Sequence, residues 1–230
     1  MKRIVTDMPE KGQSSGLSLR VRGDDIPAAL LFLILICVVI EGVLTAGDFN
    51  VFGTARLRHL AYEMGGFWPG LLQDWKSNYP SQPVLMFFTY GFLHGGLLHL
   101  AVNMFTLYSL GRAVIDRVGQ LRFLVLYLGT VLGGAWGFGM LADTLQPMVG
   151  ASGALFGLAG ALISWNYVDR FIFHRRLWPI VRVVIYLILL NIVLWYVMGG
   201  QLAWQTHLGG FVAGWVLAMI IDPRGRKADA

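Results

Sequence analysis

The sequence has few charged residues and almost no cysteine. Only 13% of its 230 residues are charged, about half of the roughly 25% typical of a soluble globular domain. Hydrophobic residues make up 56% of the chain, more than one water-soluble core of this size can bury. This composition excludes an ordinary soluble enzyme and a disordered chain. The single cysteine, Cys37, excludes an internal disulfide and lies in an apolar run as a small hydrophobic residue.

Six apolar stretches fill most of the chain, and each is long enough to cross a bilayer. They cover residues 27–47, 88–111, 121–142, 149–168, 178–198 and 203–221. The fourth is rich in Gly and Ala, so we expect it in the interior of the bundle. The first begins too far into the chain for a cleaved signal peptide, so it predicts a retained anchor. We therefore predict an all-α integral membrane protein with six transmembrane helices.

The basic residues predict the orientation of this membrane domain, which spans residues 27–222 between basic tails at 1–26 and 223–230. With a cytoplasmic N-terminus, 15 of the 18 Lys and Arg residues fall in the tails and inner loops. The positive-inside rule favours this arrangement, with both termini cytoplasmic in a multi-pass protein of the cell (inner) membrane. Because the charges are dispersed, they favour contacts with the lipid bilayer over nucleic-acid binding.

The longest predicted loop, residues 48–87, joins the first two spans on the outer side. Apolar residues recur in it at helical spacing beside Arg56 and Arg58, and several Trp and Tyr residues follow. This pattern predicts a short amphipathic helix in the outer interface and then an aromatic belt. Two interpretations stay open: a partly embedded loop that shapes access to a site, or a loop that only packs.

Polar residues within the spans are few, and such residues usually face the protein interior or a water-filled cavity. They are Glu41, His94, His99, Asn103, Ser152, Asn191 and His207. In the predicted orientation Ser152 and His207 both lie about one helical turn below the outer surface. Small residues form one helix face in each span: Ser152 precedes the face of Gly153, Gly157 and Gly160, and His207 heads the face of Gly210, Gly214 and Ala218.

Small faces allow two helices to approach closely in lipid, which would bring Ser152 and His207 together as a nucleophile and its general base. Taken singly, each has a structural explanation: a serine bonded to the backbone, or a buried histidine. No acidic residue of the fourth or sixth span is placed to orient His207, so we predict a dyad. Glu41 is expected to hydrogen-bond the outer loop or a neighbouring span.

His99 and Asn103 are four residues apart and so share a helix face, where two donors suit a tetrahedral oxyanion. His94 would lie about 140° around the same helix. We therefore interpret it as a residue at the helix start that holds the outer loop, rather than as a catalytic group.

Three motifs resemble those of the rhomboid intramembrane serine proteases. Residues 150–157, GASGALFG, are similar to the family signature G-x-S-G-x-x-x-G. His94, His99 and Asn103 match its second-span motif, and His207 with two following glycines matches its sixth-span motif. The resemblance covers about residues 25–222 and is to the minimal six-span form, a rhomboid-like bundle with a long membrane-embedded outer loop. In that loop the family's Trp-Arg pair is absent, and Leu85-Met86 stand at about its place.

The resemblance implies a role for each site residue. These are Ser152 as nucleophile, His207 as general base, His99 and Asn103 as oxyanion donors beside the Ser152 N–H, Gly150 in the pocket, and Phe156 packing on the histidine. It implies a serine endopeptidase that cuts transmembrane protein substrates near the outer membrane face, with no cofactor and no metal.

Two other functions compete with this one. A catalytically inactive rhomboid-like binder of membrane-protein clients would not need the intact Ser152 and His207 pair. A small transporter or channel could use the histidines, but the chain lacks neighbouring Asp, Glu or Cys ligands for a metal centre and has no H-E-x-x-H motif. The sequence predicts neither the identity of the substrates nor the oligomeric state.

Overall fold

The computed structural model describes residues 26–222, in which the regular elements are helices. They are α1 (Ala28–Asp48), α2 (Leu57–Gly65), η1 (Pro69–Leu72), α3 (Gln82–Thr89), η2 (Tyr90–Phe92), α4 (Leu97–Val118), α5 (Gln120–Leu141), α6 (Ser152–Ile172), α7 (Trp178–Val197) and α8 (Trp204–Ile221). Residues 1–25 and 223–230, which hold most of the two predicted basic tails, lie outside this range. The predicted all-α bundle is confirmed.

Six of the described helices are long, and five of them, α1, α4, α5, α7 and α8, are apolar enough to cross a membrane. The remaining one, α6, is the predicted interior helix. It packs mainly against α8 and α5 and also against α4, and its Ala154, Leu158 and Ala161 are buried. Its many small side chains give it a lower hydropathy than the other long helices. Neighbouring helices cover most of its surface.

Glycines bring the backbones of α6 and α8 into direct contact. A methyl group on Gly210 would overlap the carbonyl of Gly153, and one on Gly214 would overlap the carbonyl of Gly157. This is the close packing that small residues permit between membrane helices. It holds the first turns of the two helices side by side.

The start of the second span was predicted wrongly, at residue 88 instead of Leu97. Residues 82–92 form the short elements α3 and η2, and Gly96 has a left-handed φ of +103° that separates them from α4. The segment is partly buried in the protein: Met86 and Tyr90 are buried while Val84 is exposed, and the Tyr90 hydroxyl donates to the Val131 carbonyl of α5 at 2.7 Å. Hydropathy alone does not distinguish such a buried loop from a membrane span.

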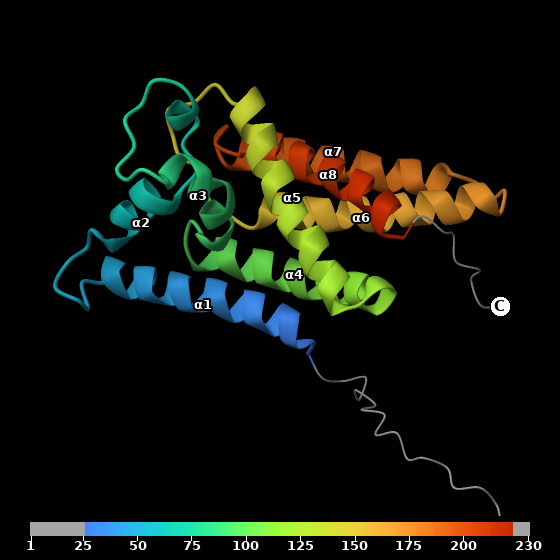
Figure 1. Ribbon diagram of the computed structural model, residues 1–230, viewed down its shortest axis with the longest axis horizontal. Helices are drawn as coiled ribbons and strands as arrows, with labels where there is room; N and C mark the ends of the chain where they lie inside the picture. The colour runs from blue at the N-terminus through green and yellow to red at the C-terminus, as the bar shows by residue number, and fades with distance from the viewer. Residues whose placement is uncertain (1–25, 223–230) are drawn as a thin grey trace, which may run out of the picture.

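The loop predicted to lie on the outer side therefore runs from residue 49 to 96, and α2 and α3 gather at the end of the bundle where α1 ends and α4 begins (Figure 1). The predicted amphipathic helix is present as α2. Its Arg58 donates to both carboxylate oxygens of the buried Glu41, at 2.7 and 3.0 Å, and to Asp48 at 2.8 Å. The expectation for Glu41 is confirmed, and these bonds raise the pKa of Arg58.

Candidate active site

Ser152 and His207 meet at the outer-loop end of α6 and α8. Ser152 is the first residue of α6, and its Oγ lies 2.8 Å from Nε2 of His207 in the first turn of α8. The imidazole is 4% exposed and stacks on the Phe156 ring, with centroids 4.1 Å apart and planes 10° apart. The structure thus brings together the predicted serine and histidine, and Phe156 supports one face of the ring.

Gly150 leaves room for His99 beside the serine. Its φ is +131°, a conformation that favours glycine, and its N–H donates to the Tyr90 carbonyl at 2.9 Å. A Cβ atom at Gly150 would lie 2.9 Å from Cε1 of His99 and 3.9 Å from the Ser152 Oγ. A side chain at this position would therefore displace the His99 ring.

The local hydrogen bond of His99 fixes the position of its ring proton. Its Nδ1 accepts the Gly95 N–H at 3.1 Å. A neutral imidazole that accepts at Nδ1 carries its hydrogen on Nε2, which lies 3.1 Å from the Cβ position of Gly150. His99 therefore presents an N–H donor on the side where Ser152 lies.

Asn103 lies one turn further along α4 and is 3% exposed. Its Nδ2 donates to the His99 carbonyl at 2.8 Å. An amide nitrogen carries two hydrogens, so this bond leaves the second one for another acceptor.

The interpretation of His94 was wrong in one respect. Its ring is fully buried and packs edge-on against His99, with centroids 5.3 Å apart. The helical-face argument fails because residues 93–96, between η2 and α4, are not helical. The link to the outer loop is present but runs through the backbone: the His94 carbonyl accepts from Arg58 at 2.9 Å and from Tyr62 at 2.6 Å.

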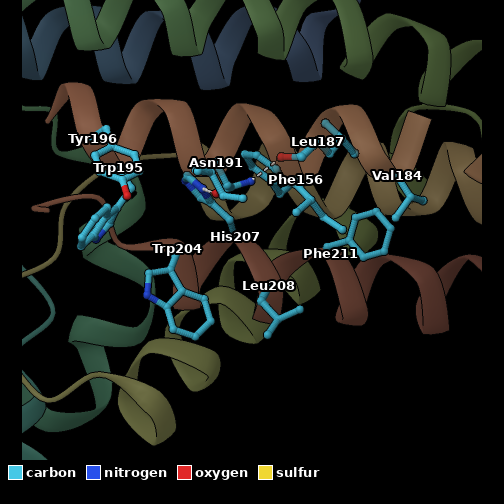
Figure 2. Close-up of a pocket in the computed structure, with 12 residues that line it drawn as sticks. Phe156, Val184, Leu187, Asn191, Trp195, Tyr196, Trp204, His207, Leu208 and Phe211 are labelled. Atoms are coloured by element: carbon cyan, nitrogen blue, oxygen red, sulfur yellow. Dashed lines mark hydrogen bonds between the residues drawn. The ribbon is translucent and has the colours of Figure 1, made fainter. Parts of the chain in front are cut away.

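Sequence reasoning missed the partner of the second His207 nitrogen. Nδ1 of His207 lies 2.6 Å from Oδ1 of Asn191, a residue of α7. Figure 2 shows the two side chains pointing toward each other between α7 and α8. The available signal was that Asn191 is the only strongly polar residue in the outer half of the predicted fifth span. The sequence argument considered only carboxylates as orienting groups.

An apolar groove of about 560 Å³ lies beside this pair (Figure 2). Aliphatic and aromatic side chains of α6, α7 and α8 line it, and Asn191 and His207 supply polar atoms in its wall. Within residues 26–222 no group of three or more His, Cys, Asp or Glu side chains is placed to hold a metal ion.

The model of one protein family, the Rhomboid domain, matches residues 81–224, more than half of the chain. The chain belongs to the rhomboid family. It is a multi-pass membrane protein by this membership and by its apolar helices. The matched range begins after α2, so it includes Ser152, His207 and Asn191 but neither Glu41 nor Arg58.

Similar rhomboid proteins occur in plants and bacteria. RHOMBOID-like protein 5 of Arabidopsis thaliana is 34% identical over 131 residues, which are 56% of this chain and 41% of that protein. RHOMBOID-like protein 4 of the same plant is 33% identical over 129 residues, 56% of this chain and 32% of that one. Rhomboid protease GluP of Bacillus subtilis (strain 168) is 33% identical over 126 residues, 55% and 24% of the two chains. The chain spans less than half the length of these relatives.

Proposed function

We propose that this rhomboid protein is an intramembrane serine endopeptidase that cuts transmembrane-anchored proteins near the outer membrane face. The observation that carries the proposal is the 2.8 Å contact between the Ser152 Oγ and the His207 Nε2. The name of the similar Bacillus subtilis protein, a rhomboid protease, supports the same activity.

In the proposed reaction His207 acts as the general base. Its Nε2 takes the Ser152 hydroxyl proton while Oγ attacks the scissile carbonyl carbon, and a tetrahedral intermediate forms. The histidine then gives this proton to the leaving amine, and the C–N bond breaks to leave an acyl-enzyme. A water molecule from the outer side hydrolyses the ester by the same proton transfers in reverse order.

Three donors are proposed to bind the oxyanion of the intermediate. The Ser152 N–H is in the first turn of α6, where backbone N–H groups have no intrahelical acceptor. His99 offers its Nε2–H from beside Gly150, and Asn103 offers its second amide hydrogen. Donors of this kind, fixed where negative charge develops, lower the barrier without reorganising during the reaction.

The substrates are proposed to be membrane-spanning proteins because the candidate site lies in a membrane domain, beside an apolar groove. We also propose that the protein resides in the cell membrane with both termini cytoplasmic, on the basis of the distribution of its basic residues.

The test combines covalent labelling with a cleavage assay. Purified protein is treated with a fluorescent fluorophosphonate, and cleavage of a transmembrane reporter is measured in liposomes. We expect Ser152→Ala and His207→Ala each to abolish labelling and cleavage, and their double mutant to be no worse, because the two residues act as one unit. Ser164→Ala and His59→Ala are the matched controls. Ser164 is a buried serine of α6 whose hydroxyl donates to the Trp215 carbonyl, and His59 lies exposed on α2.

Cleavage by Ser152→Ala at the wild-type rate would refute the protease proposal. A wild-type protein that binds reporter without cutting or labelling would instead favour the client-binding function.

A further inference from the structure

The hydrogen bonds of Asn191 determine which way its amide faces. One amide atom lies 2.9 Å from the carbonyl of Leu187, one turn earlier in α7. A carbonyl oxygen only accepts, so this atom is the Nδ2 donor. The other atom, Oδ1, is therefore the one that faces His207.

The amide in turn determines the tautomer of His207. An amide oxygen can only accept, so at 2.6 Å the Nδ1 atom of His207 must carry the hydrogen. In the neutral ring Nε2 is then unprotonated, with its lone pair 2.8 Å from the Ser152 Oγ. This is the form that a general base requires, and the opposite tautomer would present an N–H to the serine.

We propose that Asn191 is a positioning residue that holds His207 in its base-competent tautomer, so that the site is a Ser–His–Asn triad. The inference rests on the proposed serine protease function. Asn191 also accepts from Nδ1–H when the ring becomes an imidazolium after taking the serine proton, so it favours the charged intermediate state of the base.

The location of Asn191 couples the base to α7. Ile180 is the only buried residue of this helix, whereas α6 and α8 are joined along their glycine faces. The His207–Asn191 bond therefore links the firmly packed part of the site to its most loosely packed helix. Because α7 also forms one wall of the groove, its position can affect both substrate docking and the base, and a test must separate the two.

Two variants of Asn191 differ in whether they keep an oxygen acceptor for the Nδ1–H of His207. Asn191→Leu has similar size but no acceptor, and Asn191→Asp keeps an oxygen acceptor toward Nδ1. The control is Val193→Ala, on the exposed side of α7. For each we would measure the rate constant of labelling by a small fluorophosphonate, kcat and KM for the transmembrane reporter, and the melting temperature.

We expect Asn191→Leu to lower both the labelling rate and kcat by roughly ten- to a hundredfold, with little change in KM, as when a buried donor such as the Nδ1–H of His207 loses its acceptor. Asn191→Asp and Val193→Ala should stay within a few-fold of wild type. The small probe does not depend on docking of a substrate helix, so a docking role alone would change KM and leave labelling intact.

Wild-type labelling of Asn191→Leu would overturn the proposal, as would an equal loss in Asn191→Asp. If Ser152→Ala still cuts the reporter, the protease function itself is wrong and the triad with it. If Ser152→Ala is inactive and Asn191→Leu keeps the wild-type kcat, only the positioning role is wrong.

A direct measurement decides the matter even if Asn191→Leu does not fold. In wild-type protein labelled with ¹⁵N-histidine, the signal missing from His207→Ala identifies His207. At neutral pH it should show a protonated Nδ1 and an unprotonated Nε2. The reverse pattern would overturn the proposal.

Discussion

Replacing Gly210 by alanine should separate the two halves of the candidate site. The new methyl group would overlap the carbonyl of Gly153 on α6. The methyl group is bonded directly to the α8 backbone and the carbonyl is part of the α6 backbone, so neither can rotate away as a long side chain would. The clash can be relieved only if α6 and α8 move apart or shift along each other.

The size of the effect follows from the geometry. Ordinary van der Waals contact begins at 3.4 Å, and to reach it the helices would separate by roughly 1.5 Å. Overpacking of this kind costs about 1–3 kcal/mol of stability. The Ser152–His207 contact, 2.8 Å long and one turn away, would lengthen beyond hydrogen-bond range. A displacement of about 1 Å between reacting groups can cost roughly a hundredfold in rate.

The assay compares reporter cleavage and melting temperature for Gly210→Ala and Gly42→Ala. Gly42 lies on α1, and a Cβ atom there would meet nothing within 4 Å. We expect Gly210→Ala to lose at least a hundredfold in kcat and to melt earlier, and Gly42→Ala to match wild type. If Gly210→Ala keeps wild-type activity and stability, the argument that glycine contact sets the serine–histidine distance is wrong.

Three further outcomes are expected. Arg58→Met should destabilise the protein by about 3 kcal/mol in an unfolding measurement, because it leaves the buried carboxylate of Glu41 without its ion-pair partner. Adding Glu41→Leu should recover most of this loss. Asn103→Ala should lower kcat by roughly a hundred- to a thousandfold without abolishing cleavage, since other oxyanion donors remain; an unchanged kcat would remove it from the site. A cysteine at Asp74 should react with a membrane-impermeant maleimide from outside, and one at Arg175 only after permeabilisation; the opposite result would contradict the proposed orientation.

The pairing of Ser152 with His207 could be predicted because it depends on quantities that can be read along the sequence. Depth follows from the distance along each span, and the small residues mark which faces of α6 and α8 meet. The start of α4 could not be predicted in this way. The segment around Tyr90 is as apolar as a span, and only tertiary contacts, such as the hydrogen bond from Tyr90 to the Val131 carbonyl, show that it is a partly buried loop.

The partners of Asn191 and Arg58 depend on how helices rotate about their axes, which the spacing of polar residues does not reveal. The intramembrane acid Glu41 required a partner, but the sequence did not distinguish Arg58 from the other polar groups of the outer loop. For His207 no orienting partner was predicted, because no carboxylate of the fourth or sixth span is placed to contact it. The neutral amide of Asn191 on α7 contacts the His207 Nδ1 instead. Unlike a carboxylate, it places no ionised group in the membrane, where charge is costly.

The supports of the candidate site differ in rigidity, and this has a consequence for mutations. The serine and histidine are held by backbone contact between α6 and α8, and His99 is held by Gly95 and by the loop that Arg58 fastens to Glu41. Changes in these parts should lower stability and activity together. Asn191 stands on a helix with little buried surface, so its loss removes few packing contacts. Activity that falls while the melting temperature holds is therefore the expected signature of the α7 contribution, and it distinguishes positioning of the base from support of the fold.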